Sequence, residues 1–222
     1  MEDDKRREAV LTVLLALFSV LPILAVLLTA AGALANRQLV KLSLPIALLA
    51  YITIGIYAFR SRLQPLTNKL CVGFGAGLAG TLALSIVWGL GGITGFVSMA
   101  MPSFLGKLVM GYEAAYKATI VGYLYHYANG AAFGVVYALL FGKARWIVGL
   151  GYGALIWALM IVTLPMLVMG IGIVGGLKAI SVSDFAVISL FAHLIYGAVL
   201  GLLVERFVTE KSVVPVILYG GE

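Results

Sequence analysis

Two histidines, His126 and His193, fall deep inside apolar runs of the sequence, where an ionisable side chain is costly and signals a function by default. Each begins the same pattern, in which glycines follow the histidine four and eight positions later: His126, Gly130 and Gly134 in HYANGAAFG, and His193, Gly197 and Gly201 in HLIYGAVLG. Two neutral imidazoles at one membrane depth are the axial ligands that a b-type haem requires. His126 and His193 are therefore candidate metal ligands.

Three interpretations of this pattern remain open. In the haem hypothesis, Gly130 and Gly197 are cofactor-binding residues, because bare backbone one turn from each histidine would let a flat macrocycle pack closely. In the second, the GxxxG pattern draws the two helices together and the histidines donate interhelical hydrogen bonds. An interaxial distance of about 8–10 Å would then leave no room for a porphyrin between them. In the third, His126 and Asn129 line a path for a proton or a small solute.

The remaining reactive residues give little support to an enzyme or an ion-coupled carrier. All nine acidic residues lie in loops or at the ends of apolar runs, whereas coupled carriers hold carboxylates near the midplane of the membrane. The single cysteine, Cys71, excludes a disulfide scaffold and a cysteine-based zinc or iron–sulfur site. There is no nucleophile elbow and no phosphate-binding loop. We identify no self-contained catalytic site, so whether the protein is an enzyme stays undecided.

Both histidines fall on predicted membrane helices. Of the 222 residues, 63% are hydrophobic and 11% charged, against roughly 25% charged in soluble domains, which excludes a water-soluble monomer. About 20 apolar residues make one helical crossing. The sequence therefore predicts an all-α, polytopic membrane helix bundle with six transmembrane helices, near residues 9–35, 39–59, 70–92, 116–141, 146–170 and 184–207. The broken apolar segment 93–115 predicts a short interfacial or re-entrant piece rather than a seventh crossing.

Basic residues predict the orientation, because cytoplasmic loops retain Lys and Arg. Ten lie on one side of the predicted spans and five on the other: Lys5, Arg6, Arg7, Arg60, Arg62, Lys69, Lys143, Arg145, Arg206 and Lys211 against Arg37, Lys41, Lys107, Lys117 and Lys178. We therefore expect a multi-pass protein of the plasma membrane with both termini in the cytoplasm. The basic residues form no dense stripe, so nucleic acid is not an expected partner.

An internal repeat divides the predicted bundle. VGFGAG at 72–77 matches VGLGYG at 148–153, just as the two histidine patterns match each other. Each unit would be a helical hairpin, and two hairpins that enter the membrane in the same sense form a parallel repeat. The predicted organisation is an N-terminal transmembrane hairpin over 1–62, a four-helix core of two repeats over 70–207, and a cytoplasmic tail over 208–222.

The core resembles the YagU-like group of small four-helix membrane proteins over residues 70–206. The shared features are a histidine in the second core helix, a basic turn before a Trp-bearing third helix, a Pro–Met–Gly stretch and a histidine in the last helix: His126, Arg145, Trp146, Pro165, Met166, Met169, Gly170 and His193. The resemblance implies a four-helix architecture and carries over both histidines, but it implies no enzyme class.

With little mass outside the membrane, the chain is predicted to be an accessory subunit that packs in a larger membrane complex, or in a homo-oligomer. If the histidines hold haem b, that complex would transfer electrons, as a respiratory complex does. Small residues along the core helices favour such packing, because association in lipid depends on close approach. The alternative is a channel or carrier for a small uncharged solute.

Overall fold

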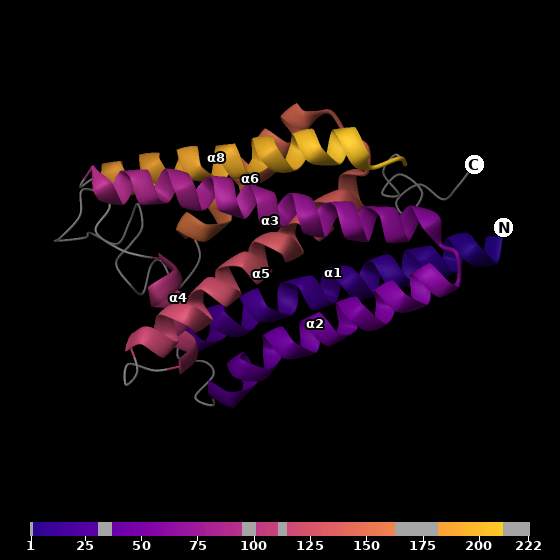
Figure 1. The fold of residues 1–222 in the computed structure, drawn as a ribbon, viewed down its shortest axis with the longest axis horizontal. Coiled ribbons are helices and arrows are strands. Elements are labelled where there is room, and N and C mark those ends of the chain that lie inside the picture. Colours follow the sequence, from indigo (N-terminus) through magenta and orange to yellow (C-terminus); the bar gives the residue numbers. More distant parts are fainter. Residues whose placement is uncertain (1, 31–36, 95–100, 111–114, 163–181, 211–222) are drawn as a thin grey trace.

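The computed structural model describes residues 2–30, 37–94, 101–110, 115–162 and 182–210. Over these ranges the chain is almost entirely helical, which confirms the all-α prediction (Figure 1). The helices are α1 (Glu2–Ala30), α2 (Arg37–Arg60), α3 (Gln64–Ile93), α4 (Met101–Met110), α5 (Ala115–Phe141), α6 (Trp146–Val162) and α8 (Val182–Phe207).

Four helices, α1, α2, α3 and α8, are long and apolar enough to cross a membrane, so the chain is a multi-pass membrane protein. α5 has 27 residues, about 40 Å at 1.5 Å per residue, and it carries His126, Asn129 and several tyrosines among its apolar residues. α6 is apolar over its 17 described residues. Six crossings, as predicted, would require α5 and α6 to span the membrane in addition to these four helices.

Two helices begin earlier than predicted. α1 begins at Glu2 rather than 9, and α3 begins at Gln64 rather than 70. Pro65 stands in the first turn of α3, where its missing N–H leaves no helical hydrogen bond unmade. The turn before it is tight, because Arg62 has a φ of 57°. The charged and polar residues 64–69, read as a loop from the sequence, are thus the first turns of α3.

The later predictions are met only in part. α6 begins at Trp146 as predicted, but residues 163–170 of the predicted helix, with Pro165 and Gly170, lie outside the described residues. The last helix, α8, begins at Val182, close to the predicted 184. In the tail, Val208 is buried and the Lys143 N–H donates to the Glu210 carbonyl at 2.7 Å, while 211–222 lie outside the description.

The short helix α4 agrees with the prediction that segment 93–115 does not make a seventh crossing. Its ten residues are too few to span a bilayer. Its buried Val109 belongs to a cluster with Val26 of α1, Val40 of α2 and Tyr125 of α5. α4 therefore covers the end of the bundle where these three helices meet.

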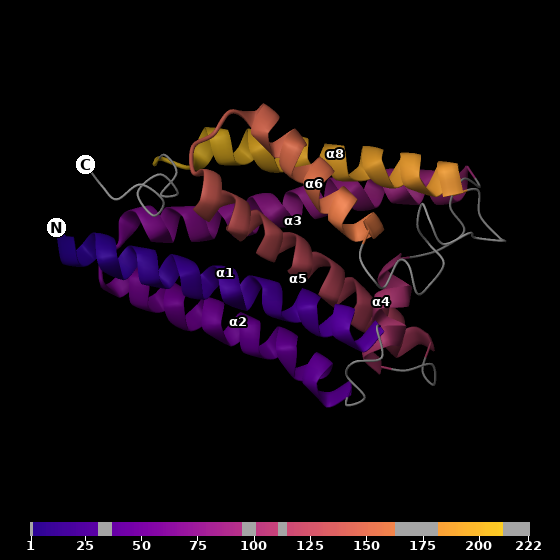
Figure 2. The same cartoon turned by 180° about the vertical axis from the view of Figure 1, so that it is seen from behind.

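α3 occupies a central place in the bundle. It packs against α5 and α8, while α6 packs on α8 (Figures 1 and 2). The α1–α2 hairpin lies on the other side of α5 and touches the start of α3. One end of the bundle holds the start of α1, the α2–α3 turn, the α5–α6 turn and the end of α8. We call it the basic end, after the residues it carries, and the opposite end the far end.

A buried ion pair joins α1 to α3 near the basic end. Lys69 Nζ lies 3.4 Å from Glu8 Oε1, and the Lys69 side chain is only 2% exposed. The same region holds one buried apolar cluster, which includes Leu15 of α1, Leu66 and Leu70 of α3 and Leu139 of α5. The N-terminal hairpin is therefore attached to the core by an ion pair as well as by apolar packing.

Candidate functional site

Glycines hold α3 and α5 in close contact. A Cβ added to Gly73 would lie 2.8 Å from the carbonyl oxygen of Gly134, and one added to Gly77 would lie 2.8 Å from the Cα of Ala131. Side chains do not approach backbone this closely, so only glycine fits at these positions. The face of Gly130 is covered in the same way, by the side chain of Thr81.

The second hairpin uses the same device in a different register. A Cβ on Gly149 of α6 would lie 2.8 Å from the Cα of Gly201, and one on Gly197 would lie 3.1 Å from the Cα of Gly153. Gly153 meets the carbonyl of His193, whereas Gly77, its counterpart in the sequence repeat, meets that of Gly130. Since Gly130 corresponds to Gly197, the second hairpin is displaced by one helical turn.

The glycines predicted to bind a cofactor therefore face protein. α3 covers Gly130 and α6 covers Gly197, which leaves no bare backbone there for a macrocycle. The structure also differs from the second interpretation, in which these glycines draw the two histidine-bearing helices together, because each glycine pair joins neighbours within its own hairpin. The reason is that both helices of each hairpin carry glycines at a four-residue spacing and can interlock with each other.

The two histidines nonetheless lie at one level inside the core. The hydroxyl of Tyr196 on α8 donates to the Gly130 carbonyl on α5 at 2.8 Å, which fixes these parallel helices relative to each other. His126 is four residues before Gly130 and His193 three before Tyr196, so both imidazoles lie about one turn nearer the far end. They are close enough to interact electrostatically, and His193 is 9% exposed.

Each histidine has one hydrogen-bond partner that bears on its tautomer. The Ser85 hydroxyl on α3 lies 2.8 Å from the Thr81 carbonyl and 3.1 Å from His126 Nε2, and when its hydrogen is donated to Thr81 the His126 Nε2–H donates to Ser85 Oγ. His193 Nδ1 lies 2.7 Å from the Ser189 carbonyl, which only accepts, so this nitrogen carries the proton. The lone pairs of His126 Nδ1 and His193 Nε2 are left available to a ligand.

Three buried polar atoms near the histidines have no hydrogen-bond partner within the described part of the chain: Asn129 Oδ1 on α5, Trp157 Nε1 on α6 and Ser189 Oγ on α8. Gly153 lies against His193. Trp157 follows Gly153 by one turn and Ser189 precedes His193 by one turn on the antiparallel neighbour, so these two residues share a level one turn beyond His193 toward the far end. We call Ser85, His126, Asn129, Trp157, Ser189 and His193 the polar cluster.

Further hydroxyl groups extend from the polar cluster toward the basic end. The Tyr152 hydroxyl of α6 donates to the Phe133 carbonyl at 3.0 Å, and the ring of Tyr152 lies 5.2 Å from that of Tyr137. Tyr137 is fully buried, and its hydroxyl is another polar atom with no partner among the residues described. Polar groups thus continue through the core for about three helical turns from the histidines toward the basic end.

A model of a family of unknown function, DUF6789, matches residues 67–214, about two thirds of the chain. The chain belongs to DUF6789. The match covers the polar cluster entirely and nearly the same residues as the YagU-like resemblance, so it supports a small uncharacterised family but not that group. No curated protein and no solved structure matches the chain.

The chemistry available to this DUF6789 core is that of uncharged hydrogen bonding. Trp157 and Ser189 offer donors, while Asn129 and the two imidazole lone pairs offer acceptors. Across the described ranges, no group of three or more His, Cys, Asp or Glu residues could hold a metal ion. Of the residues in the polar cluster, the sequence predicted both histidines and named Asn129. It missed Ser85, Trp157 and Ser189, whose only signal is a polar atom within an apolar run.

Proposed function

We propose that this protein is a channel or carrier for a small uncharged polar solute, which binds at the polar cluster. The observation that supports the proposal is the set of three buried polar atoms without partners, Asn129 Oδ1, Trp157 Nε1 and Ser189 Oγ, beside two histidines. A buried polar group without a partner costs about 1–3 kcal/mol, so a core that keeps three of them is built to receive hydrogen bonds from something else.

The absence of charge at the cluster favours an uncharged ligand. Burial disfavours a charged imidazolium, and the acidic residues of the described ranges lie at or near helix ends. An ion or a charged metabolite would need a buried counter-charge to compensate for its lost hydration. A molecule with a donor and an acceptor, such as water, urea or glycerol, needs only the hydrogen bonds that the cluster supplies.

Solute flux into liposomes tests this proposal. Vesicles containing the purified protein should shrink and refill faster than empty vesicles when challenged with water, urea or glycerol gradients, as followed by stopped-flow light scattering. Asn129→Leu, which keeps the volume and removes the amide, should reduce the flux of the permeant solute about tenfold, the effect of losing one hydrogen bond of about 1.4 kcal/mol.

The matched control is Tyr123→Phe, which also removes one polar group from α5, but at a side chain that is 46% exposed on the outside of the bundle. It should leave the flux unchanged. Equal rates in empty vesicles, wild-type vesicles and Asn129→Leu vesicles would reject the solute path.

A second candidate function is that of an accessory subunit in a larger membrane complex. It is favoured by two glycines that face outward from the core, Gly75 on α3 and Gly151 on α6, since a Cβ at either would meet nothing within 4 Å. Glycine on a surface that faces lipid contributes no side-chain contact, but it permits a helix of another subunit to approach closely. Both exposed glycines lie on the side opposite to the pairs that close each hairpin.

Purification from native membranes in mild detergent tests the subunit role. The wild-type chain should migrate in a complex much larger than its own 23.5 kDa, and Gly75→Leu with Gly151→Leu should release it. Leu82→Ile, a swap at an exposed position of α3, is the control. Migration of the wild type alone would remove this candidate. A reduced-minus-oxidised spectrum of the same complex tests a bis-histidine haem b on His126 and His193, and a flat trace would remove the haem alone.

The distribution of basic residues supports an orientation with both termini in the cytoplasm of a cell bounded by a plasma membrane. Arg6, Arg7, Arg60, Arg62 and Arg206 all lie at the basic end, and cytoplasmic segments retain such residues. In this orientation the polar cluster is reached from the outside, while Tyr137 and Tyr152 continue the polar groups toward the cytoplasm.

A further inference from the structure

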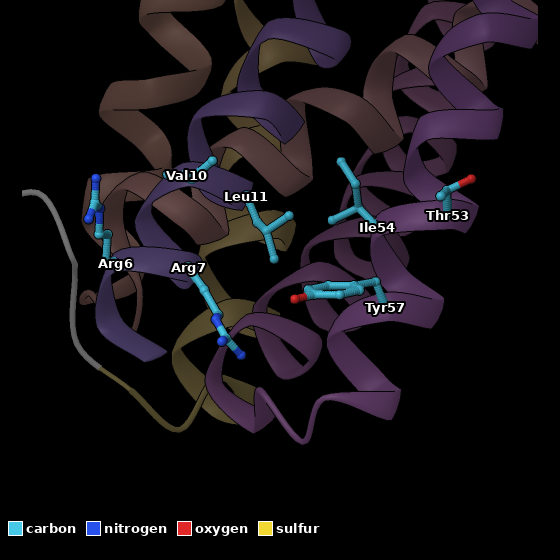
Figure 3. A pocket seen from close by; sticks show the side chains of 7 residues that line it. All are labelled: Arg6, Arg7, Val10, Leu11, Thr53, Ile54 and Tyr57. Carbon is cyan, nitrogen blue, oxygen red and sulfur yellow. The ribbon is translucent and has the colours of Figure 1, made fainter. Parts of the chain in front are cut away.

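A groove opens between α1 and α2 at the basic end, away from the polar cluster (Figure 3). Its volume is about 440 Å³, within the range of sites that hold small ligands. Leu11 of α1 and Ile54 of α2 face each other across it, and Val10 lies beside them. The walls are therefore apolar and lie on helices that both cross the membrane.

Cationic and polar groups stand at one end of this groove. Arg7 and the Tyr57 hydroxyl extend toward the same space, and Arg6 lies at its edge (Figure 3). Both arginines are exposed, and neither has a carboxylate partner among the side chains that the structure describes, where Glu8 pairs with Lys69. The Arg7 guanidinium and the Tyr57 hydroxyl could both donate hydrogen bonds to a phosphate, and Arg6 adds a second positive charge at the edge.

We propose that the groove binds one anionic phospholipid of the leaflet at the basic end. Its phosphate would lie between Arg7 and the Tyr57 hydroxyl, with Arg6 at the edge, and its acyl chain along Val10, Leu11 and Ile54. The argument rests on complementarity: the groove joins a cationic rim to apolar walls, and an anionic phospholipid joins an anionic head to an apolar chain. Basic residues at the cytoplasmic surface attract such lipids by about 1 kcal/mol each.

The site differs in kind from one for free phosphate or for a neutral lipid. Free phosphate would use the arginines but not the apolar walls, whereas a zwitterionic lipid would use the walls without satisfying two cations. The lipid would also link α1 to α2 at the level where Glu8 links α1 to α3, so its binding should stabilise the N-terminal hairpin.

Native mass spectrometry and thermal unfolding of the full chain in detergent test the proposal. Added phosphatidylglycerol should be retained on the wild type and raise its unfolding temperature, whereas phosphatidylcholine and inorganic phosphate should do neither. Arg6→Gln with Arg7→Gln should weaken phosphatidylglycerol retention at least tenfold. Val10→Trp, which fills the groove without altering charge, should weaken it as well.

The control is Arg60→Gln with Arg62→Gln, which removes the same charge at the same end of the bundle but outside the groove. It should retain the lipid as the wild type does. An equal loss in this control would replace the groove with a diffuse electrostatic effect and overturn the proposal. Equal retention of phosphatidylcholine, competition by inorganic phosphate, or full retention in Val10→Trp would overturn it too.

Discussion

Glu8→Gln is expected to destabilise the protein by about 3–5 kcal/mol, the cost of leaving a buried charge without its partner. The charge is the ammonium of Lys69, which is 2% exposed and has Glu8 Oε1 3.4 Å away. Desolvation of a lysine is tolerable only when a carboxylate compensates for it. Because this pair joins α1 to α3, its loss should loosen the N-terminal hairpin before the rest of the bundle.

Unfolding in mixed detergent, followed by tryptophan fluorescence or circular dichroism, measures the effect. Replacing both partners by apolar residues, Glu8→Leu with Lys69→Met, should restore stability to within about 1 kcal/mol of the wild type, since apolar pairs replace buried ion pairs at little cost. Glu210→Gln removes an exposed carboxylate near the same end and should have no effect. A Glu8→Gln variant as stable as this control would show that the ion pair is dispensable.

Gly77→Ala should destabilise the bundle by about 1–3 kcal/mol, whereas Gly75→Ala, two residues away on the same helix, should not. The added methyl at Gly77 would lie 2.8 Å from the Cα of Ala131, and backbone cannot move aside as a flexible side chain can. At Gly75 it would meet nothing within 4 Å. The methyl there should be neutral or slightly stabilising, because alanine favours helix.

The expected drop in unfolding temperature for Gly77→Ala is roughly 2–12 °C for a chain of this size. The second hairpin offers an independent copy of the experiment, in which Gly153→Ala should behave like Gly77→Ala and Gly151→Ala like Gly75→Ala. Equal stabilities within either pair would contradict the close packing of glycine on backbone described for that hairpin.

The membrane bundle was predictable because hydrocarbon requires long apolar helices, and α1, α2, α3 and α8 meet that requirement on their own. The start of α3 could not be predicted, because Lys69 has the charge expected of a loop. The burial of Lys69 depends on Glu8, sixty-one positions earlier, and no local pattern relates the two residues. The same pairing explains why the N-terminal hairpin is joined more closely to the core than its sequence indicated.

The candidate site was predictable where residue type alone is informative. A histidine in an apolar run is rare, so His126 and His193 stood out, whereas Trp157 and Ser189 are ordinary residues of membrane helices until their polar atoms are seen without partners. The packing register was beyond the sequence for a geometric reason. Glycines that repeat every four residues fit their partner equally well after a shift of one turn, and the second hairpin adopts that shift.

Two polar side chains of α5 bear on how the chain enters the membrane during synthesis. The amide of Asn129 and the imidazole of His126 oppose the transfer of α5 into lipid. α3 precedes it on the ribosome and presents the backbone of Gly73 and Gly77 as a docking surface. The order of helices along the chain thus provides α5 with a partner in the bilayer before α5 itself emerges.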